Sequence, residues 1–264
     1  MREDFSKSLN QLSFDNSKHY LLHVSLIDLG LFKDLKPDKL CHFILSSLKR
    51  KTPKNSTFYT LSPFYDYSNR KENFNLSSKN VSKEVGSFAK YLISLKKSKR
   101  SNNPIFNLCA NGPASNKIFS NTSTSSFGFD SAWHRLFDKN CEMIFIGCDL
   151  SKCTFIRFIE FNFGVPYIFN KYFSFPIKKN KTKINNFSIS QLRYLNAKIE
   201  YKTIKFEELL IKKKLLIKSE NKNISIMKIK MKDAFKVGVE ELSKNPFYFL
   251  KGKPKFTKQF KPYN

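Results

Sequence analysis

The chain has 264 residues, which is enough for one large domain or two small ones. Hydrophobic residues make up 41% of it, with 28 phenylalanines, so a wholly disordered chain is excluded. The 48 Lys and Arg against 21 Asp and Glu give a net charge of +27, which favours an anionic partner: a nucleic acid, a membrane surface or a phosphate-rich small molecule. The bias towards Lys, Asn and Phe is also typical of an AT-rich genome, so part of this charge has a compositional explanation.

Targeting and cofactor signals are missing from the sequence. The N-terminal residues contain no apolar signal-peptide core, and no run approaches the ~18 apolar residues of a membrane span. The five cysteines form no CxxC pair, which favours reduced thiols over metal ligands or disulfides. The eight glycines build neither a dinucleotide fingerprint nor a P-loop. We therefore expect a cytoplasmic protein with no membrane insertion and no metal, and the oligomeric state stays open, including a homo-oligomer.

Hydrophobic spacing predicts strands and helices that alternate along the chain, which indicates an α/β or α+β fold. The expected elements are a strand at 19–25, a helix from its N-cap Asp38 to Leu48, a strand at 57–61, a helix at 85–95, a strand at 142–148, a helix from its cap Thr154 to Phe161, an exposed loop at 178–190, a strand at 223–229 and a helix at 231–243. No repeat or linker is visible. We expect a single domain over residues 1–264, with an elaborated C-terminal part from about residue 175.

Two windows of the chain contain no acidic residue, one between Glu84 and Asp130 and the other between Glu160 and Glu200. Both windows contain several Lys and Arg. If the fold brings them together, they form a strongly positive surface; the alternative is an ordinary solvated lysine face.

Histidines are the first candidates for proton transfer. His23 ends a buried strand, and ligands of open α/β sheets bind outside such carboxyl ends, although a packed histidine is the more common case. His134 stands beside Trp133 after a polar loop and is a general-base candidate. Arg157 and Glu160 share a helix face, either as a surface ion pair or as a charged pair at the wall of a site.

Seven short blocks follow one another over about residues 20–250. They are His23-Val24-Ser25-Leu26 with Gly30, Ser56 to Pro63, Ser82 to Gly86, Arg100 to Pro104 with Ala110 to Gly112, Phe127-Gly128 with Ser131 to Phe137, Ile144 to Gly147 with Thr154 to Glu160, and Asp233 to Phe247. In this order they resemble the aminoglycoside 3-N-acetyltransferase-like (antibiotic N-acetyltransferase) family. The resemblance implies an α/β fold whose central mixed β-sheet is flanked by helices. It also implies transfer of an acyl group from acyl-coenzyme A to an amine, usually on a sugar.

The chain departs from the family where the expected base stands. Arg157 replaces the usual histidine, and Asn103 and Asn107 replace a histidine and a serine of another block. An arginine cannot act as the base because its pKa exceeds ~12. The base is therefore His134, which we favour, or else His23 or Glu160, unless the amine arrives neutral.

The resemblance also implies roles for other residues of these blocks. For catalysis we expect His134 as the base, with Glu160 orienting the amine and Ser25 near the thioester carbonyl. For acyl-coenzyme A, as acetyl-CoA or 3-hydroxybutanoyl-CoA, it implies contacts from His23, Ser25, Leu26, Arg100 and Ser101. For the acceptor it implies contacts from Arg157, Asn103, Asn107 and Trp133.

Charge separates the branches of this family. Some members acylate amino sugars carried on dTDP for surface polysaccharides such as O-antigen in lipopolysaccharide, and both of their substrates carry phosphates. Aminoglycosides are polycations, which a chain with a charge of +27 repels. We therefore expect an N-acyltransferase for a dTDP-linked amino-dideoxy sugar. The alternatives are an aminoglycoside 3-N-acetyltransferase, a basic nucleic-acid-binding protein and a catalytically lapsed family member.

Overall fold

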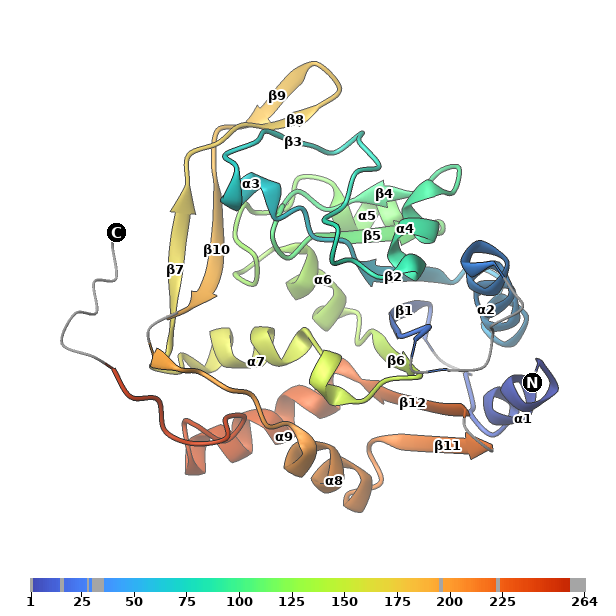
Figure 1. The fold of residues 1–264 in the computed structure, drawn as a ribbon. Helices are drawn as coiled ribbons and strands as arrows, with labels where there is room; N and C mark the ends of the chain where they lie inside the picture. The colour runs from blue at the N-terminus through green and yellow to red at the C-terminus, as the bar shows by residue number, and fades with distance from the viewer. Residues whose placement is uncertain are drawn as a thin grey trace.

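The computed structural model describes residues 2–14, 17–27, 29, 36–194, 197–221 and 224–256. A seven-stranded sheet crosses the molecule in the order β11-β12-β6-β1-β2-β5-β4 (Figure 1). In that order its strands are Ile217–Asn221, Ile224–Lys230, Glu142–Ile146, His19–Val24, Thr57–Leu61, Leu108–Asn111 and Lys99–Arg100. Among the described residues, no helix has both the length and the apolar character to cross a membrane.

The centre of the sheet is parallel and its flanks are antiparallel. Strand β1 pairs in parallel with both β2 and β6, whereas β5 and β12 run antiparallel to their neighbours. The carboxyl ends of β1, β2 and β6 therefore meet at one edge, where α/β sheets bind their ligands. This mixed sheet flanked by helices confirms the expected fold class.

Alternation along β1 gives the sheet two apolar faces. Tyr20 and Leu22 point to one face and Leu21 to the other, because successive side chains of a strand alternate. The first face is covered by α1 (Arg2–Asn10), α2 (Pro37–Lys51) and α4 (Ser87–Ser94). The second is covered by α5 (Ser115–Phe119), α6 (Ala132–Asp138), α7 (Phe155–Phe163), α8 (Ile204–Lys212) and α9 (Met231–Lys244).

Two small sheets extend from this core. Strands β7 (Ile168–Phe173) and β10 (Ser188–Arg193) form an antiparallel ribbon that stands beside the main body in Figure 1. Strand β3 (Phe74–Asn75) follows the short helix α3 (Asp66–Asn69) in the sequence. It pairs with β8 (Ile177–Lys179), and β8 pairs with β9 (Thr182–Asn185). In Figure 1 the ribbon stands at the left of the molecule and the hairpin at its top. Strand β10 of the ribbon and strands β8 and β9 of the hairpin each contribute to the wall of one of the two cavities described below.

The structure corrects the loop expected at 178–190, which contains β9 and parts of β8 and β10. Its Lys and Asn residues face water on both sides of the hairpin, so no hydrophobic alternation marks the strands. Asn180 makes the reversal with a left-handed φ of 55°, a conformation that asparagine tolerates.

Helix ends also differ in detail from the sequence pattern. The cap of α2 is Lys36 rather than Asp38, because Pro37, whose ring presets φ, takes the first position of the helix. Thr154 is the N-cap of α7, as expected, but its side chain makes no capping hydrogen bond. That helix continues to Phe163 and ends at Gly164, whose φ of 83° suits glycine.

Candidate active site

A cavity of about 720 Å³ lies beside the carboxyl end of β2. Its wall comes from Leu61 at the end of β2, the segment 150–154 after β6, the first turns of α7, the end of β10 and the segment 199–203. We call it the α7 cavity. Its charged lining residues are Lys152, Arg157, Arg193 and Glu200, so three cations face one carboxylate.

Arg157 and Glu160, one turn apart on α7, form the centre of this wall. The Arg157 Nη1 lies 3.4 Å from Glu160 Oε2 and also donates to the hydroxyl of Tyr201. The guanidinium carbon sits 4.2 Å from the centroid of the Tyr201 ring. The Tyr201 hydroxyl donates to Glu160 Oε2 at 2.8 Å, and the Tyr167 hydroxyl donates to Oε1 at 2.7 Å. The pair is therefore part of a buried network and is not the surface ion pair that spacing alone favours.

The surroundings of Glu160 limit its chemistry. Its side chain is fully buried and both oxygens already accept hydrogen bonds. Burial raises the pKa of Glu160, while Arg157 and the two tyrosine hydroxyls act in the opposite direction. Because the carboxylate is covered, it holds Arg157 in place and does not reach a substrate amine. The Arg157 side chain keeps 20% of its surface exposed and presents guanidinium N–H groups to the cavity.

His23 lies at the carboxyl end of β1, as expected, but its ring is packed. It stacks on Phe145 with centroids 4.5 Å apart and planes 12° apart. Neither ring nitrogen has a hydrogen-bond partner among the described residues. Burial lowers the pKa of His23 to about 4, so the imidazole is neutral at pH 7.

Ser25 and Leu26 continue from His23 along the same edge. The Ser25 N–H donates to the Ile146 carbonyl at 3.0 Å, which ties this turn to β6, and both side chains are half-buried. Gly86, the N-cap of α4, lies beside this turn: a Cβ placed on it would be 4.0 Å from the Val24 carbonyl oxygen. The turn after β1 and the start of α4 thus come together, although 60 residues of sequence separate them.

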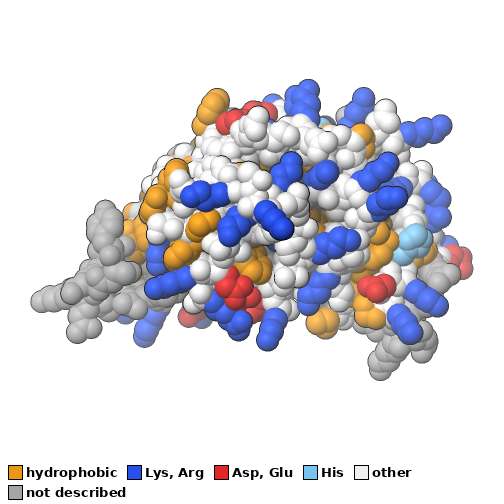
Figure 2. All heavy atoms as spheres, turned by 90° about the horizontal axis from the view of Figure 1, so that it is seen from above, with side chains coloured by type: hydrophobic (Ala, Val, Ile, Leu, Met, Phe, Trp, Pro, Cys, Tyr) orange, Lys and Arg blue, Asp and Glu red, His pale blue; other side chains and the backbone are white. Residues whose placement is uncertain are grey.

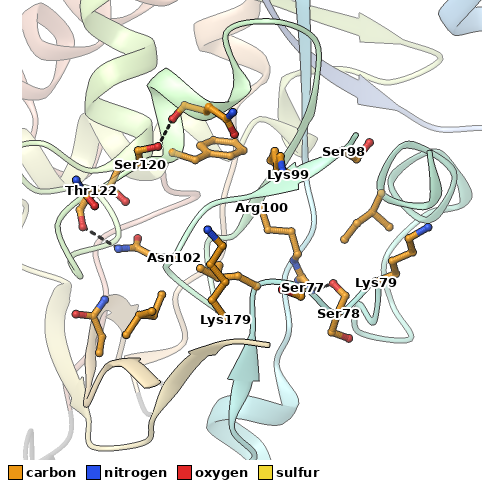
Figure 3. Close-up of a pocket in the computed structure, with 17 residues that line it drawn as sticks. Ser77, Ser78, Lys79, Ser98, Lys99, Arg100, Asn102, Ser120, Thr122 and Lys179 are labelled. Atoms are coloured by element: carbon orange, nitrogen blue, oxygen red, sulfur yellow. Dashed lines mark hydrogen bonds between the residues drawn. The ribbon is translucent and has the colours of Figure 1, made fainter. Parts of the chain in front are cut away.

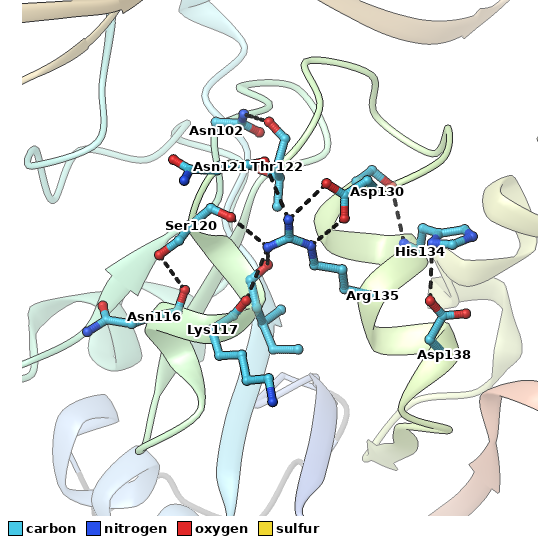
Figure 4. A network of polar contacts seen from close by, with 12 residues as sticks. Asn102, Asn116, Lys117, Ser120, Asn121, Thr122, Asp130, His134, Arg135 and Asp138 are labelled. Carbon is cyan, nitrogen blue, oxygen red and sulfur yellow. Dashed lines mark hydrogen bonds and ion pairs between the residues drawn. The ribbon is translucent and has the colours of Figure 1, made fainter.

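His134 lies elsewhere, on α6, and is not among the residues that line the α7 cavity. Its ring is 3.4 Å from Asp138 Oδ2 and 5.0 Å from the ring of Phe129, which is 83% exposed. Its backbone N–H donates to Ser131 Oγ, the cap of the helix (Figure 4). The structure therefore gives His134 a surface ion pair and does not bring it to Arg157.

Arg100, Ser101 and Asn107 form a buried support. Arg100 Nε donates to Asn107 Oδ1 at 2.9 Å, and its terminal nitrogens donate to the carbonyls of Ser62, Ser78 and Asn80. The Asn107 amide donates to Ser101 and Asn103, and the Ser101 hydroxyl accepts from the Leu108 N–H. These bonds occupy the groups from which the sequence predicted contacts with coenzyme A and the acceptor.

Asn103 and Trp133 support the wall of the α7 cavity from behind. Asn103 Oδ1 accepts from the Ile105 and Phe106 N–H groups, and its amide donates to Ile189 on β10. The Trp133 indole donates to the Phe106 carbonyl at 2.9 Å. Both side chains are at least 96% buried, and Ile105 and Phe106 line the cavity. Their geometry fits positioning of the wall rather than contact with substrate.

Sequence reasoning missed several lining or supporting residues, among them Tyr65, Tyr167, Gln191 and Tyr201. They come from separate segments and belong to none of the recognised blocks, so no local pattern identifies them. Within the described part of the chain, no group of three His, Cys, Asp or Glu side chains is suited to hold a metal. None of the five cysteines forms a disulfide.

A family model described as aminoglycoside 3-N-acetyltransferase matches residues 51–243. No curated protein matches the sequence. Among solved structures, the aminoglycoside acetyltransferase AAC(3)-IIb is 13% identical, with 92% of this chain and 97% of that chain covered and a TM-score of 0.74. AAC-IIIb, solved as a binary complex with CoASH, is 14% identical over 96% of this chain and 99% of its own, with a TM-score of 0.74. The YokD protein from Bacillus subtilis is 16% identical over 92% and 99%, with a TM-score of 0.70.

At these identities the solved structures show a shared fold, while the family model covers more than half of the chain. The matched range contains α7 and the Arg157–Glu160 pair, whereas the turn at 23–26 lies before it. The chain therefore belongs to the aminoglycoside 3-N-acetyltransferase family and is an N-acetyltransferase for amino sugars that uses acyl-coenzyme A as co-substrate.

Proposed function

We propose that this enzyme acylates the amino group of a nucleotide-linked amino-dideoxy sugar, with dTDP as the first choice of nucleotide, in surface-polysaccharide biosynthesis. The acyl group is acetyl or a short hydroxyacyl such as 3-hydroxybutanoyl, and the expected location is the cytoplasm. The observation that carries the proposal is the charge of the α7 cavity, in which Lys152, Arg157 and Arg193 face Glu200.

This charge balance suits an anionic acceptor. A diphosphate gains charge-assisted hydrogen bonds from Arg and Lys, and a planar guanidinium pairs with two phosphate oxygens. A polycationic aminoglycoside meets like charges in the same cavity, and such contacts cost free energy. Glu200 is the one acidic residue on the wall, and its Oε2 already lies 3.3 Å from the Lys251 ammonium.

Coenzyme A would approach along the carboxyl edge of the sheet. The turn at 23–26 and the start of α4 meet there, and unpaired N–H groups at the start of a helix suit phosphate groups. Acyl-coenzyme A supplies the activated thioester. In the proposed arrangement Ser25, at this edge, contacts the thioester carbonyl.

In the proposed mechanism Arg157 acts as a donor and not as a base. Its guanidinium, fixed by Glu160 and Tyr201, stabilises either the developing oxyanion or a substrate phosphate. Since neither Arg157 nor the covered Glu160 accepts the proton, the acceptor amine enters in its neutral form. The kcat/KM for the acceptor should then rise with pH until the substrate amine itself is deprotonated.

The test is turnover of purified enzyme with acetyl-CoA or 3-hydroxybutanoyl-CoA, read as release of the coenzyme A thiol. The acceptors are a dTDP-3-amino-3,6-dideoxyhexose, the same sugar without its nucleotide, and gentamicin. We expect the dTDP-sugar to be preferred over the free sugar by about 100-fold or more in kcat/KM, as two charge-assisted contacts allow. Preference for gentamicin would instead establish the aminoglycoside activity and overturn the proposal.

Paired variants locate this preference in the α7 cavity. The double variant Lys152→Gln with Arg193→Gln should raise the KM for the dTDP-sugar about tenfold and leave that for the free sugar unchanged. The matched control, Lys212→Gln with Lys213→Gln on exposed α8 positions, removes the same charge away from the cavity. Equal effects of the two variants would mean that overall charge, and not the cavity, selects the substrate.

An aminoglycoside acceptor is the second candidate. The family description favours it, as do the solved structures of AAC(3)-IIb and of AAC-VIa bound to sisomicin. The gentamicin arm of the same assay decides between the two acceptor classes.

A further inference from the structure

A second cavity, of about 590 Å³, lies between the edge strand β4, the segment 76–79 after β3 and the β8–β9 hairpin (Figure 3). The segment 116–122, which includes the end of α5, closes its other side. We call it the hairpin cavity. It shares no lining residue with the α7 cavity, so it is a separate site.

The hairpin cavity brings together the two acid-free windows of the sequence. Residues 98–122 come from the first window, and Lys179, Ile184 and Asn185 come from the second. Among the described residues no acidic side chain lines it, whereas three exposed lysines do: Lys79, Lys99 and Lys179. Figure 2, which views the molecule from the side of β8 and β9, shows Lys and Arg spread over this face with few acidic side chains among them. A concave, positively charged wall focuses the potential on an anion inside it.

Arg100 adds a buried cation at this wall. Its residue is 6% exposed, it lines the cavity, and Figure 3 shows it between Lys99 and Lys179. Its hydrogen-bond acceptors are all neutral: three backbone carbonyls and the amide oxygen of Asn107. Burial lowers the pKa of Arg100 to about 10, so the side chain remains charged at pH 7. A buried cation normally has an anionic partner, and here no carboxylate among the described residues supplies one.

The walls are fixed before any ligand binds. The Asn180 N–H donates to Asn75 Oδ1 and to Ser77 Oγ, both at 3.2 Å, which joins the hairpin to the opposite wall. Arg135 makes two hydrogen bonds to Asp130 and donates to the carbonyls of residues 117, 118, 120 and 121, which holds the third wall (Figure 4). A preformed site spends little free energy on ordering when a ligand arrives.

Neutral donors supplement the positive charge. Ser77 and Ser78 line the cavity, and in the hydrogen bonds among the described residues their hydroxyls accept from backbone N–H groups. The hydroxyl of Thr122 has no hydrogen-bond partner among the described residues although that side chain is 93% buried. Hydroxyl and ammonium donors together match the acceptor-rich surface of a phosphate group. The volume lies within the range of small-molecule sites and is suited to a nucleotide-sized ligand.

We propose that the hairpin cavity is a second, non-catalytic binding site for a small molecule that carries two linked phosphates, such as a diphosphate or a nucleoside diphosphate. The proposal does not depend on the acceptor of the proposed function, because it concerns a separate cavity. It assigns a local role to the positive charge of the two acid-free windows, from which the α7 cavity takes a single lining cation, Arg193.

Calorimetric titration of the full chain at 150 mM salt with inorganic pyrophosphate, dTDP and coenzyme A tests the site. At least one should bind with a micromolar Kd. The triple variant Lys79→Gln, Lys99→Gln and Lys179→Gln should weaken that binding tenfold or more, since it removes the exposed cations of the cavity. A second variant, Ile184→Glu, places an acid at an exposed lining position and should weaken binding in the same way.

The matched control is Lys49→Gln, Lys51→Gln and Lys54→Gln, which removes the same charge from exposed positions at the end of α2 and after it. It should bind as the wild-type chain does. An equal loss in the control, or no binding of any of the three ligands at millimolar concentration, would overturn the proposal. Binding of a short single-stranded DNA with none of the small ligands would also overturn it and would identify the face as a nucleic-acid surface.

Steady-state kinetics of the same triple variant identifies the source of the phosphates. A raised KM for acyl-CoA or for the acceptor would assign the phosphates to a substrate and would overturn the non-catalytic role of the site. Unchanged KM values together with weakened pyrophosphate binding assign it to a separate effector. If the proposed acceptor fails while pyrophosphate still binds at the hairpin cavity, the proposed function falls and this site remains.

Discussion

One arginine lies at the wall of each cavity, and the surroundings of the two side chains differ in one respect. Arg157 on α7 has a fully buried carboxylate, Glu160, 3.4 Å away, with Tyr201 shared between them. Arg100 on β4 has four neutral oxygen acceptors and the face of Phe74, whose centroid lies 4.6 Å from the guanidinium carbon. The first charge is balanced within the protein and the second is not.

Because of this difference, one guanidinium is suited to orient a bound group and the other to attract an anion. A guanidinium held by a carboxylate and an aromatic ring points in a fixed direction, and its net field is reduced by the opposite charge beside it. A guanidinium held by carbonyls is equally fixed, but its full charge adds to that of Lys79, Lys99 and Lys179. We therefore expect Arg157 to position a reacting group, and Arg100 to add to the attraction of anions into the hairpin cavity.

The strongest test of this contrast is Arg100→Ala. It leaves three carbonyls and the Asn107 amide oxygen without their donor, and it detaches β4 from the segment around residues 78–80. We expect the free energy of unfolding, measured in urea, to fall by roughly 4 kcal/mol. Arg70→Ala is the control, because the Arg70–Asp66 pair is exposed and should contribute less than about 1 kcal/mol. Similar losses for both would show that the neutral acceptors do not hold Arg100.

His23 differs from both arginines because its buried side chain is neutral at pH 7. Its folded pKa of about 4 lies below the ordinary 6.5, so between these values the unfolded chain binds more protons. The free energy of unfolding should therefore decrease as the pH falls from 6.5 to 4, with His23 contributing roughly 3 kcal/mol. Urea titrations of the wild-type chain and of His23→Phe at pH 7 and 4.5 measure the contribution of His23. Other groups, including His19, titrate in both proteins, so the difference between the two pH dependences belongs to His23. Equal pH dependence in the two proteins would contradict it.

Glu160→Gln tests the arginine whose charge is balanced, because it removes the carboxylate that pairs with Arg157. The substitution keeps the shape but removes the charge that accepts from Arg157, Tyr167 and Tyr201. We expect a loss of roughly 2 kcal/mol in urea unfolding, the range for hydrogen bonds to a buried charged group. Glu241→Gln is matched to it, because Glu241 pairs with Lys244 at the same i, i+3 spacing on an exposed helix face. Its loss should stay within about 0.5 kcal/mol. A comparable loss in both variants would mean that burial adds nothing to the pair.

The sequence predicted the central strands and the long helices because their burial follows a simple period. Strand 57–61 and the helices at 85–95 and 231–243 agree with β2, α4 and α9 to within about two residues. The β8–β9 hairpin escaped detection because its residues after Ile177 are mostly solvated, so they carry no apolar alternation. Sequence pattern therefore identifies elements that build the core more reliably than those that wall its cavities.

Site residues could be predicted from the sequence only where the residues in contact are close to each other along the chain. Arg157 and Glu160 are one helical turn apart, and the spacing alone suggested that they interact. Tyr201 and Tyr167 complete the network from other segments, and no spacing relates them to α7. Arg100 and Asn107 belong to a recognised block, yet their side chains bond to each other and to the backbone, a role that residue type does not reveal.

His134→Ala should produce the smallest effect. The imidazole belongs to a partly exposed pair with Asp138, and it lines neither cavity. We expect kcat and KM to stay within about twofold of wild type and the free energy of unfolding to change by less than about 0.5 kcal/mol. Arg157→Ala, assayed beside it, should reduce kcat/KM about 100-fold, as expected when a charge-assisted donor to the reacting groups is lost. A large loss in His134→Ala with an intact fold would instead identify His134 as the base. That result would require α6 to approach the α7 cavity during turnover, because only movement of this helix brings the imidazole to the acceptor amine.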